Sequence, residues 1–181
     1  NVAVLPDDHL VLMSDSASYL SAATSVAKGD EDSLTAEEGV SSLAKQAGDP
    51  VAAVQWSSTF ACEDLSMGSA DEEDQRVADE LVAKAGDVSP IEGVVMAQQA
   101  DRSLVIGLHF ETSDQASANL QPRVDLASGD APGQGGSFPD RFTLASGTAH
   151  DQDVVLTTKP TGRSASVLSD LSSGPVLFAT C

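Results

Sequence analysis

The stretch that decides the fold runs from residue 92 to residue 114 and reads EGVVMAQQ, ADR, SLVIGLHFE and TSD. Two apolar runs joined by a short polar turn predict a β-hairpin. The Thr112-Ser113-Asp114 that follows predicts the N-terminal cap of a helix. Side chains alternate along a strand, so one face of the second strand is apolar and forms the core face. That face consists of Leu104, Ile106, Leu108 and Phe110, while Val105, Gly107 and His109 point the other way.

The same patterns extend in both directions along the chain. Further strands are predicted at 2–5, 10–13, 51–60, 141–146, 154–159 and 176–180. Helices are predicted after caps at 14–15, 35–38, 69–72 and 112–115, with one or two helical turns at 165–171. Strand pairs that alternate with helices predict an α+β fold, in which a mostly antiparallel sheet is covered on one face by helices.

Length and repetition bear on the domain organisation. The 181 residues fit one domain spanning 1–181. The strand at residue 10 runs into SDSASYL, and the strand at residue 104 runs into SDQASANL. A duplicated strand–helix unit is consistent with this likeness, and it would divide the domain into related halves at 1–86 and 87–181.

The charge excludes several classes of function. Nine Lys and Arg residues against 28 Asp and Glu residues give a formal net charge of −19. Such a chain repels phosphate backbones and anionic lipid headgroups, so nucleic acid is not an expected partner. No window reaches the ~18–20 apolar residues of a membrane span, so this segment is not expected to insert into a membrane. The chain does not begin with Met, and an upstream signal, lipid anchor or membrane helix is compatible with that.

Cys62 and Cys181 each end an apolar run, at 58–62 and 177–181. If these runs are neighbouring strands, a disulfide would close a loop of on the order of 100 residues and stabilise the fold by up to ~4.7 kcal/mol. It would also indicate an oxidising compartment. The alternative is two buried free thiols in a cytosolic protein. A cysteine at position 181 is poorly placed to be buried and inert, which favours the disulfide.

The glycine-rich segment 129–136 is the strongest candidate for an anion-binding loop, because closely spaced glycines let backbone N–H groups approach a ligand. A phosphate loop needs Gly-Lys-Ser/Thr at the start of a helix, whereas Gly135-Gly136 precede Ser137-Phe138-Pro139. We therefore expect no cofactor, and an ordinary or partner-binding loop over 129–140. Gly-x-Ser-x-Gly does not occur in the sequence, so the nucleophile elbow of a serine hydrolase has no support.

Other candidates for chemistry are histidines and carboxylates. His9, His109 and His150 lack the spacing of a zinc site and are expected to be surface or structural residues. In an enzyme, His109 with a nearby acid, or His150 with Asp151, would be the available bases. The acidic clusters 30–32 and 71–74 do not fit an EF-hand, and the second complements a helix dipole. No metal site is therefore expected.

The resemblance of this chain to other proteins rests on four segments, namely DHLVLMSDSASYLSAATSVAKGDEDSL (8–34), VAAVQW (51–56), APGQGGSFPDRF (131–142) and SDLSSGPVLFATC (169–181). Together they resemble uncharacterised secreted or membrane-anchored, lipoprotein-like proteins of high-GC Gram-positive (actinobacterial) bacteria. The resemblance implies an extracytoplasmic domain of unknown function and carries over no functional residue.

These observations lead to one main expectation and two alternatives. The main expectation is a non-enzymatic extracytoplasmic domain of a bacterial cell-envelope protein, secreted or anchored, held by Cys62–Cys181 and acting by binding or structural support. Its partner would be an unknown envelope protein or a small ligand. The alternatives are a small-ligand or peptide binder that uses the 129–140 loop, and an enzyme with a histidine-based site. No oligomeric state follows from the sequence.

Overall fold

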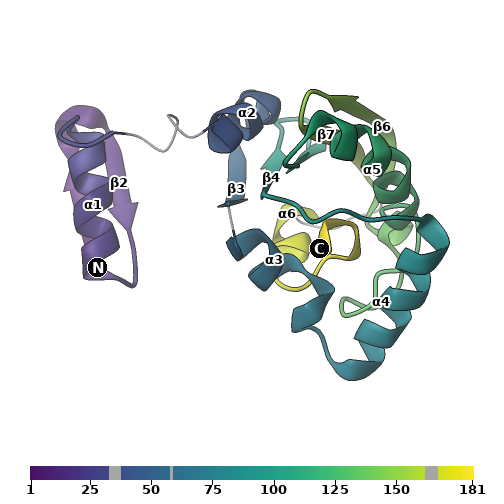
Figure 1. Ribbon diagram of the computed structural model, residues 1–181. Coiled ribbons are helices and arrows are strands. Elements are labelled where there is room, and N and C mark those ends of the chain that lie inside the picture. The colour runs from purple at the N-terminus through teal and green to yellow at the C-terminus, as the bar shows by residue number, and fades with distance from the viewer. Residues whose placement is uncertain (33–37, 58, 162–166) are drawn as a thin grey trace. The chain divides into compact units, whose positions relative to one another are not determined.

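The computed structural model describes residues 1–32, 38–57, 59–161 and 167–181 (Figure 1). The sequence predicted one domain, with possible halves at 1–86 and 87–181. Contacts group the chain into two compact units, Asn1–Glu38 and Gly39–Cys181. A boundary at residue 86 would cut through the main sheet, because β3 (Ala52–Ser57) pairs with β4 (Gly93–Gln98). Each unit is described by itself.

The N-terminal unit is a hairpin followed by a helix. Strands β1 (Val2–Leu5) and β2 (Leu10–Met13) are antiparallel, as predicted, and the 3₁₀ turn η1 (Pro6–Asp8) joins them. Helix α1 (Ala17–Ala27) is capped by Ser16, whose side chain accepts a hydrogen bond from the backbone N–H of Tyr19. The predicted caps Ser14 and Asp15 thus lie slightly too early. The predicted capping box that begins at Thr35 lies outside the described residues.

The second unit is built on a five-stranded sheet with the order β3-β4-β5-β7-β6, in which every neighbouring pair is antiparallel. The remaining strands are β5 (Leu104–His109), β6 (Phe142–His150) and β7 (Asp153–Pro160). The fold is therefore α+β with an antiparallel sheet, as predicted. Both predicted hairpins are confirmed, and in the structure they span 93–109 and 142–160.

The main core lies on the predicted face of the sheet. Leu104, Ile106 and Leu108 are buried there. Helix α5 (Ser113–Leu126) packs on this side against β6 and β7, and α4 (Glu72–Ala85) packs against α5. The predicted capping box of α5 is present, with Thr112 and Gln115 bonded to each other's backbone. Pro122 lies inside α5 without dividing it.

Helices cover both faces of the sheet, whereas the sequence predicted only one covered face. Helix α2 (Glu38–Ala47) places Leu43 and Ala47 against Val95 and Ala97 on the opposite face. Gly107 permits this close approach, because a Cβ there would lie 2.9 Å from Val95 Cγ1 and 3.0 Å from Leu43 Cδ2. The side chains on this second face of β4 and β5 are thus also apolar, and α2 buries them.

The end of the strand predicted at 51–60 and the strand predicted at 176–180 are helical, whereas Ala52–Ser57 forms β3 as predicted. The structure forms α3 (Thr59–Leu65) and the 3₁₀ turn η3 (Met67–Ser69) where the sequence predicted the end of a strand and an irregular link. The 3₁₀ turn η5 (Leu177–Ala179) replaces the predicted strand at 176–180. Short helices η4 (Phe138–Asp140) and α6 (Val167–Leu171) complete the unit. Helix α4 is capped by Asp71 and not by Ser69.

Candidate functional site

The end of the chain is buried in the main core. Val176, Leu177, Phe178 and Ala179 are each at most 1% exposed. Phe178 contacts the rings of Phe138 and Phe142, with centroids 5.0 Å and 6.3 Å away. The last residues therefore contribute core side chains without belonging to a strand, and their backbone groups need partners from elsewhere.

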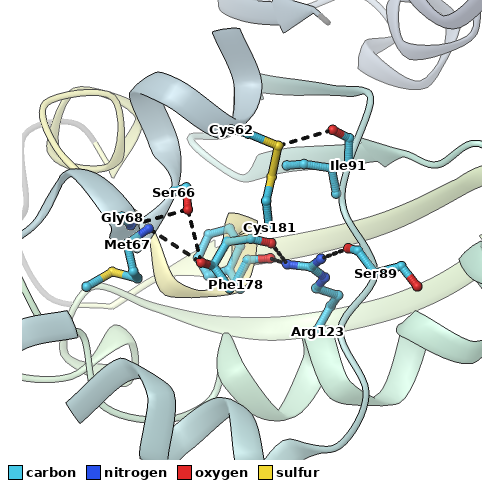
Figure 2. The surroundings of a disulfide bond; sticks show 10 residues. Cys62, Ser66, Met67, Gly68, Ser89, Ile91, Arg123, Phe178 and Cys181 are labelled. Carbon is cyan, nitrogen blue, oxygen red and sulfur yellow. Dashed lines mark hydrogen bonds between the residues drawn. A yellow bond between two sulfur atoms is a disulfide. The ribbon is translucent and has the colours of Figure 1, made fainter. Parts of the chain in front are cut away.

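The partner that supplies most of these bonds is Arg123 of α5, which is fully buried (Figure 2). Its Nη1 donates to the carbonyl oxygens of Phe178, at 3.0 Å, and Thr180, at 2.6 Å. Its Nη2 donates to the carbonyl oxygen of Ser89 at 2.6 Å, and its guanidinium carbon lies 5.7 Å from the centre of the Phe110 ring. One side chain thus joins α5, the segment before β4 and the end of the chain.

Arg123 has an unusual electrostatic environment. Within the described parts of the chain it forms no ion pair, and its buried Nε has no hydrogen-bond partner. Desolvation penalises the charged form, so burial lowers the pKa of Arg123 to about 9. The guanidinium therefore remains charged at neutral pH, and carbonyl dipoles are its main stabilising partners.

The disulfide between Cys62 and Cys181 links the same terminal segment covalently to α3 (Figure 2). The two Cα atoms are 5.7 Å apart, and 119 positions separate the residues in sequence. The predicted pair is therefore joined, although Cys62 lies in α3 and Cys181 follows η5, so neither is in a strand. A loop of this length corresponds to roughly 5 kcal/mol in the chain-entropy model.

Thr180 provides a third attachment. Its Oγ1 lies 3.3 Å from Ser66 Oγ and accepts a hydrogen bond of 3.4 Å from the backbone N–H of Met67. The backbone N–H of Val176 donates to the carbonyl oxygen of Leu65 at 2.8 Å. Sequence reasoning missed Arg123, Ser66 and Thr180 because their partners are distant in the chain. A single Arg among the small residues of α5 was the available signal.

A second buried polar cluster lies beneath α2. His109, at the end of β5, pairs directly across the strands with Asp153 of β7. His109 Nδ1 lies 2.6 Å from Asp153 Oδ1, and the side chains are 10% and 2% exposed. Ser42 of α2 donates to Asp153 Oδ2, and Gln46 Nε2 lies 3.5 Å from the same oxygen. The cluster thus connects α2 to two strands, and His109 is structural and not a surface residue.

The contacts of this cluster fix the orientation of the His109 imidazole ring. Burial raises the pKa of Asp153, but hydrogen bonds from His109 and Ser42 outweigh it and hold that pKa below its ordinary value. An ionised carboxylate only accepts, so Nδ1 of His109 carries the hydrogen. The other edge of the ring faces Gly39 of α2, where an added Cβ would lie 3.1 Å from Nε2. The backbone of α2 therefore lies close to this second ring nitrogen.

The other predicted candidates are not brought together with His109. His150 Nδ1 lies 2.9 Å from Asp151 Oδ2 at the surface, and the side chains are 76% and 85% exposed. His9 is exposed in the N-terminal unit. In cluster 71–74, Asp71 caps α4 and the next acidic residues occupy its first turn. No group of three or more His, Cys, Asp or Glu residues within the described ranges could hold a metal ion, cluster 30–32 included.

The 129–140 loop is ordered by Arg141. Its guanidinium donates to the carbonyl oxygens of Gln134, Gly135 and Ser137 at 2.8–3.2 Å. Three glycines have positive φ angles and so permit the turn, namely Gly133, Gly135 and Gly136. A polar cavity of about 460 Å³ adjoins the loop and is lined by Gly133, Gln134, Arg141, Asp170, Ser173 and Gly174. The loop is therefore a formed surface next to a hollow.

The fold and these sites define an α+β protein with one disulfide and a buried polar anchor for its last residues. No family model, curated protein or solved structure matches the chain. Across the described residues, no helix is both long and apolar enough to cross a membrane.

We predict that Asp153→Asn lowers the free energy of unfolding by about 1–3 kcal/mol at pH 7, because the amide accepts less strongly from His109 and Ser42. The pKa of Asp153 is lowered in the folded state. Its contribution is therefore present above the unfolded value of about 4 and is lost as the pH falls through the folded value. Urea titrations from pH 7 to pH 2 should show the two proteins converging below about pH 4. Asp151→Asn is the exposed control, and a difference that grows in acid would contradict the prediction.

Proposed function

We propose that this chain is a non-enzymatic extracytoplasmic domain of a bacterial cell-envelope protein, secreted or anchored, which acts by binding or structural support. The observation that carries the proposal is the disulfide between Cys62 and Cys181. Disulfides form and persist in oxidising compartments and are rare in the cytosol. The acidic surface, with a formal charge of −19, agrees with a protein that stays soluble outside the cytoplasm.

The position of the disulfide supports a structural role for it. Cys181 directly follows Thr180, whose carbonyl is bound by Arg123, so the bond secures a segment that already fills the core. Here the bond closes a long loop around the main core, which is how small exported domains gain stability.

The buried histidine supports a non-enzymatic role. A general base must reach the proton that it abstracts. Nδ1 of His109 is bonded to Asp153, and the backbone of α2 at Gly39 lies close to the other ring nitrogen. The competing enzyme hypothesis would have to rely on His150 and Asp151, two neighbouring side chains that are each more than three-quarters exposed.

The proposal is tested by thiol labelling and cell fractionation of the protein in its native cells. Cells are treated with an alkylating reagent during denaturing lysis, and the intact mass of the protein is measured with and without prior reduction. We expect no labelled cysteine before reduction, two after it, and recovery in the envelope or culture supernatant. Labelling of both cysteines in protein recovered from the cytoplasm would contradict the proposal.

A second candidate function is the binding of a small polar ligand or peptide at the 129–140 loop. It is favoured by the cavity beside that loop, whose lining residues include the oppositely charged Arg141 and Asp170. Opposite charges on one small cavity suit a zwitterionic ligand such as an amino acid or a short peptide. The hydrogen bonds of Arg141 to the loop also keep the cavity formed in the absence of a ligand.

This candidate is tested by ligand titration of the isotope-labelled protein with the common amino acids and with di- and tripeptides. Binding is expected to shift backbone amide signals of the loop and of Ser173 and Gly174. Ser173→Trp places a large side chain at the exposed rim and should abolish the shifts, while Ser117→Trp, at an exposed position of α5, should retain them. Shifts that survive Ser173→Trp, or no shift with any compound, would contradict binding of this class at the cavity.

A further inference from the structure

The sheet has two edge strands, and they differ in how well they are protected. Strand β6 contains an irregularity between Leu144 and Ser146, which interrupts its register. Strand β3 pairs with β4 in continuous register from Ala52 to Ser57, and within the described chain β4 is its only partner. Natural proteins protect exposed edges with charges, prolines or bulges. The segment AAVQWS of β3 has none of them.

The free edge of β3 presents a defined set of backbone groups. The N–H of Gln99 donates to the carbonyl oxygen of Ser103, which fixes which residues of β4 are bonded to β5. Because backbone groups alternate in direction along a strand, the remaining residues of β4 bond to β3. By the same alternation, Ala53, Gln55 and Ser57 direct their N–H and C=O groups away from the sheet.

The side chains of β3 suit a partner that is also uncharged and apolar. Val54 is 37% exposed, and Trp56 is only partly buried against the main core. No residue of β3 is charged, although the whole chain carries a formal charge of −19. A second copy of β3 can therefore approach this edge without placing like charges opposite each other, which is not true of most surfaces on so acidic a chain.

We propose that two copies of this chain associate through antiparallel pairing of their β3 strands. A two-fold axis perpendicular to the sheet keeps both main cores on the same side, and it passes between Gln55 and Gln55 of the second copy. Ala53 then pairs with Ser57 of the second copy, so all three outward-directed residues of each strand form hydrogen-bonded pairs. The two five-stranded sheets become one continuous sheet.

This register also gives the best side-chain pairs. Val54 lies opposite Trp56 of the second copy, twice by symmetry, on the side of the main core. Aromatic and β-branched residues that face each other across antiparallel strands are stabilising pairs. A register shifted to place Val54 opposite itself keeps the faces aligned but leaves Ser57 without a partner, so it forms fewer hydrogen bonds. The structure therefore favours one register, in which Gln55 meets its own copy.

The register is tested by charge exchange at Gln55, whose side chain is exposed. The oligomeric state of the full chain is measured by sedimentation equilibrium over a range of concentrations. We expect a concentration-dependent dimer for the native sequence. Gln55→Lys and Gln55→Glu should each raise the dissociation constant by about tenfold or more, because like charges then face each other. An equimolar mixture of the two variants should restore dimers, now with one copy of each.

Matched control variants distinguish an effect at the β3 edge from a loss of folding and from a change in the overall charge. Thr148→Lys and Thr148→Glu introduce the same charges at an exposed position of β6 and should leave the dissociation constant unchanged. The single tryptophan, Trp56, reports directly on the interface, so its fluorescence should shift on dilution of the native protein and not in Gln55→Lys. A native chain that stays monomeric at all concentrations would overturn the proposal. Failure of the mixture to form dimers would overturn it equally.

Discussion

The structure of residues 39–181 depends on the way in which Arg123 satisfies the backbone of the last residues. Phe178 and its neighbours supply core side chains, and a buried carbonyl without a partner costs about 1–3 kcal/mol. Arg123 meets this need by donating to the carbonyl oxygens of Phe178 and Thr180, and the same planar group also donates to that of Ser89. The disulfide at Cys181 then prevents the end of the chain from separating. The main core, α5 and the segment before β4 are thereby joined at one point.

The same sheet carries a second buried polar group on its other face. Asp153 receives hydrogen bonds from His109 and Ser42, so α2 is held to β5 and β7 at one defined position. Both buried polar groups thus hold separate elements together. Both binding surfaces that we propose, the cavity beside the 129–140 loop and the edge of β3, are exposed. The buried groups stabilise the fold that carries them.

Local patterns in the sequence were sufficient for much of the fold. The hairpin at 93–109 and the cap at Thr112 follow from alternation and capping within a few residues. The apolar run at 58–62 was ambiguous, because a short apolar run fits a strand or a buried helix equally well. The burial of His109 could not be predicted, because it requires α2 to pack across the sheet at Gly39. The cysteine pair was predicted correctly, although its strand context was wrong.

The most direct test of this account is the free energy of unfolding of Arg123→Met, measured in urea with the disulfide intact. Met has a similar length and no donor, so the carbonyl oxygens of Ser89, Phe178 and Thr180 would be left buried and unpaired. We expect a loss of roughly 2–4 kcal/mol. Replacing a buried charge with an apolar side chain is in some proteins neutral or stabilising. An unchanged or increased free energy of unfolding would therefore contradict the central role of Arg123.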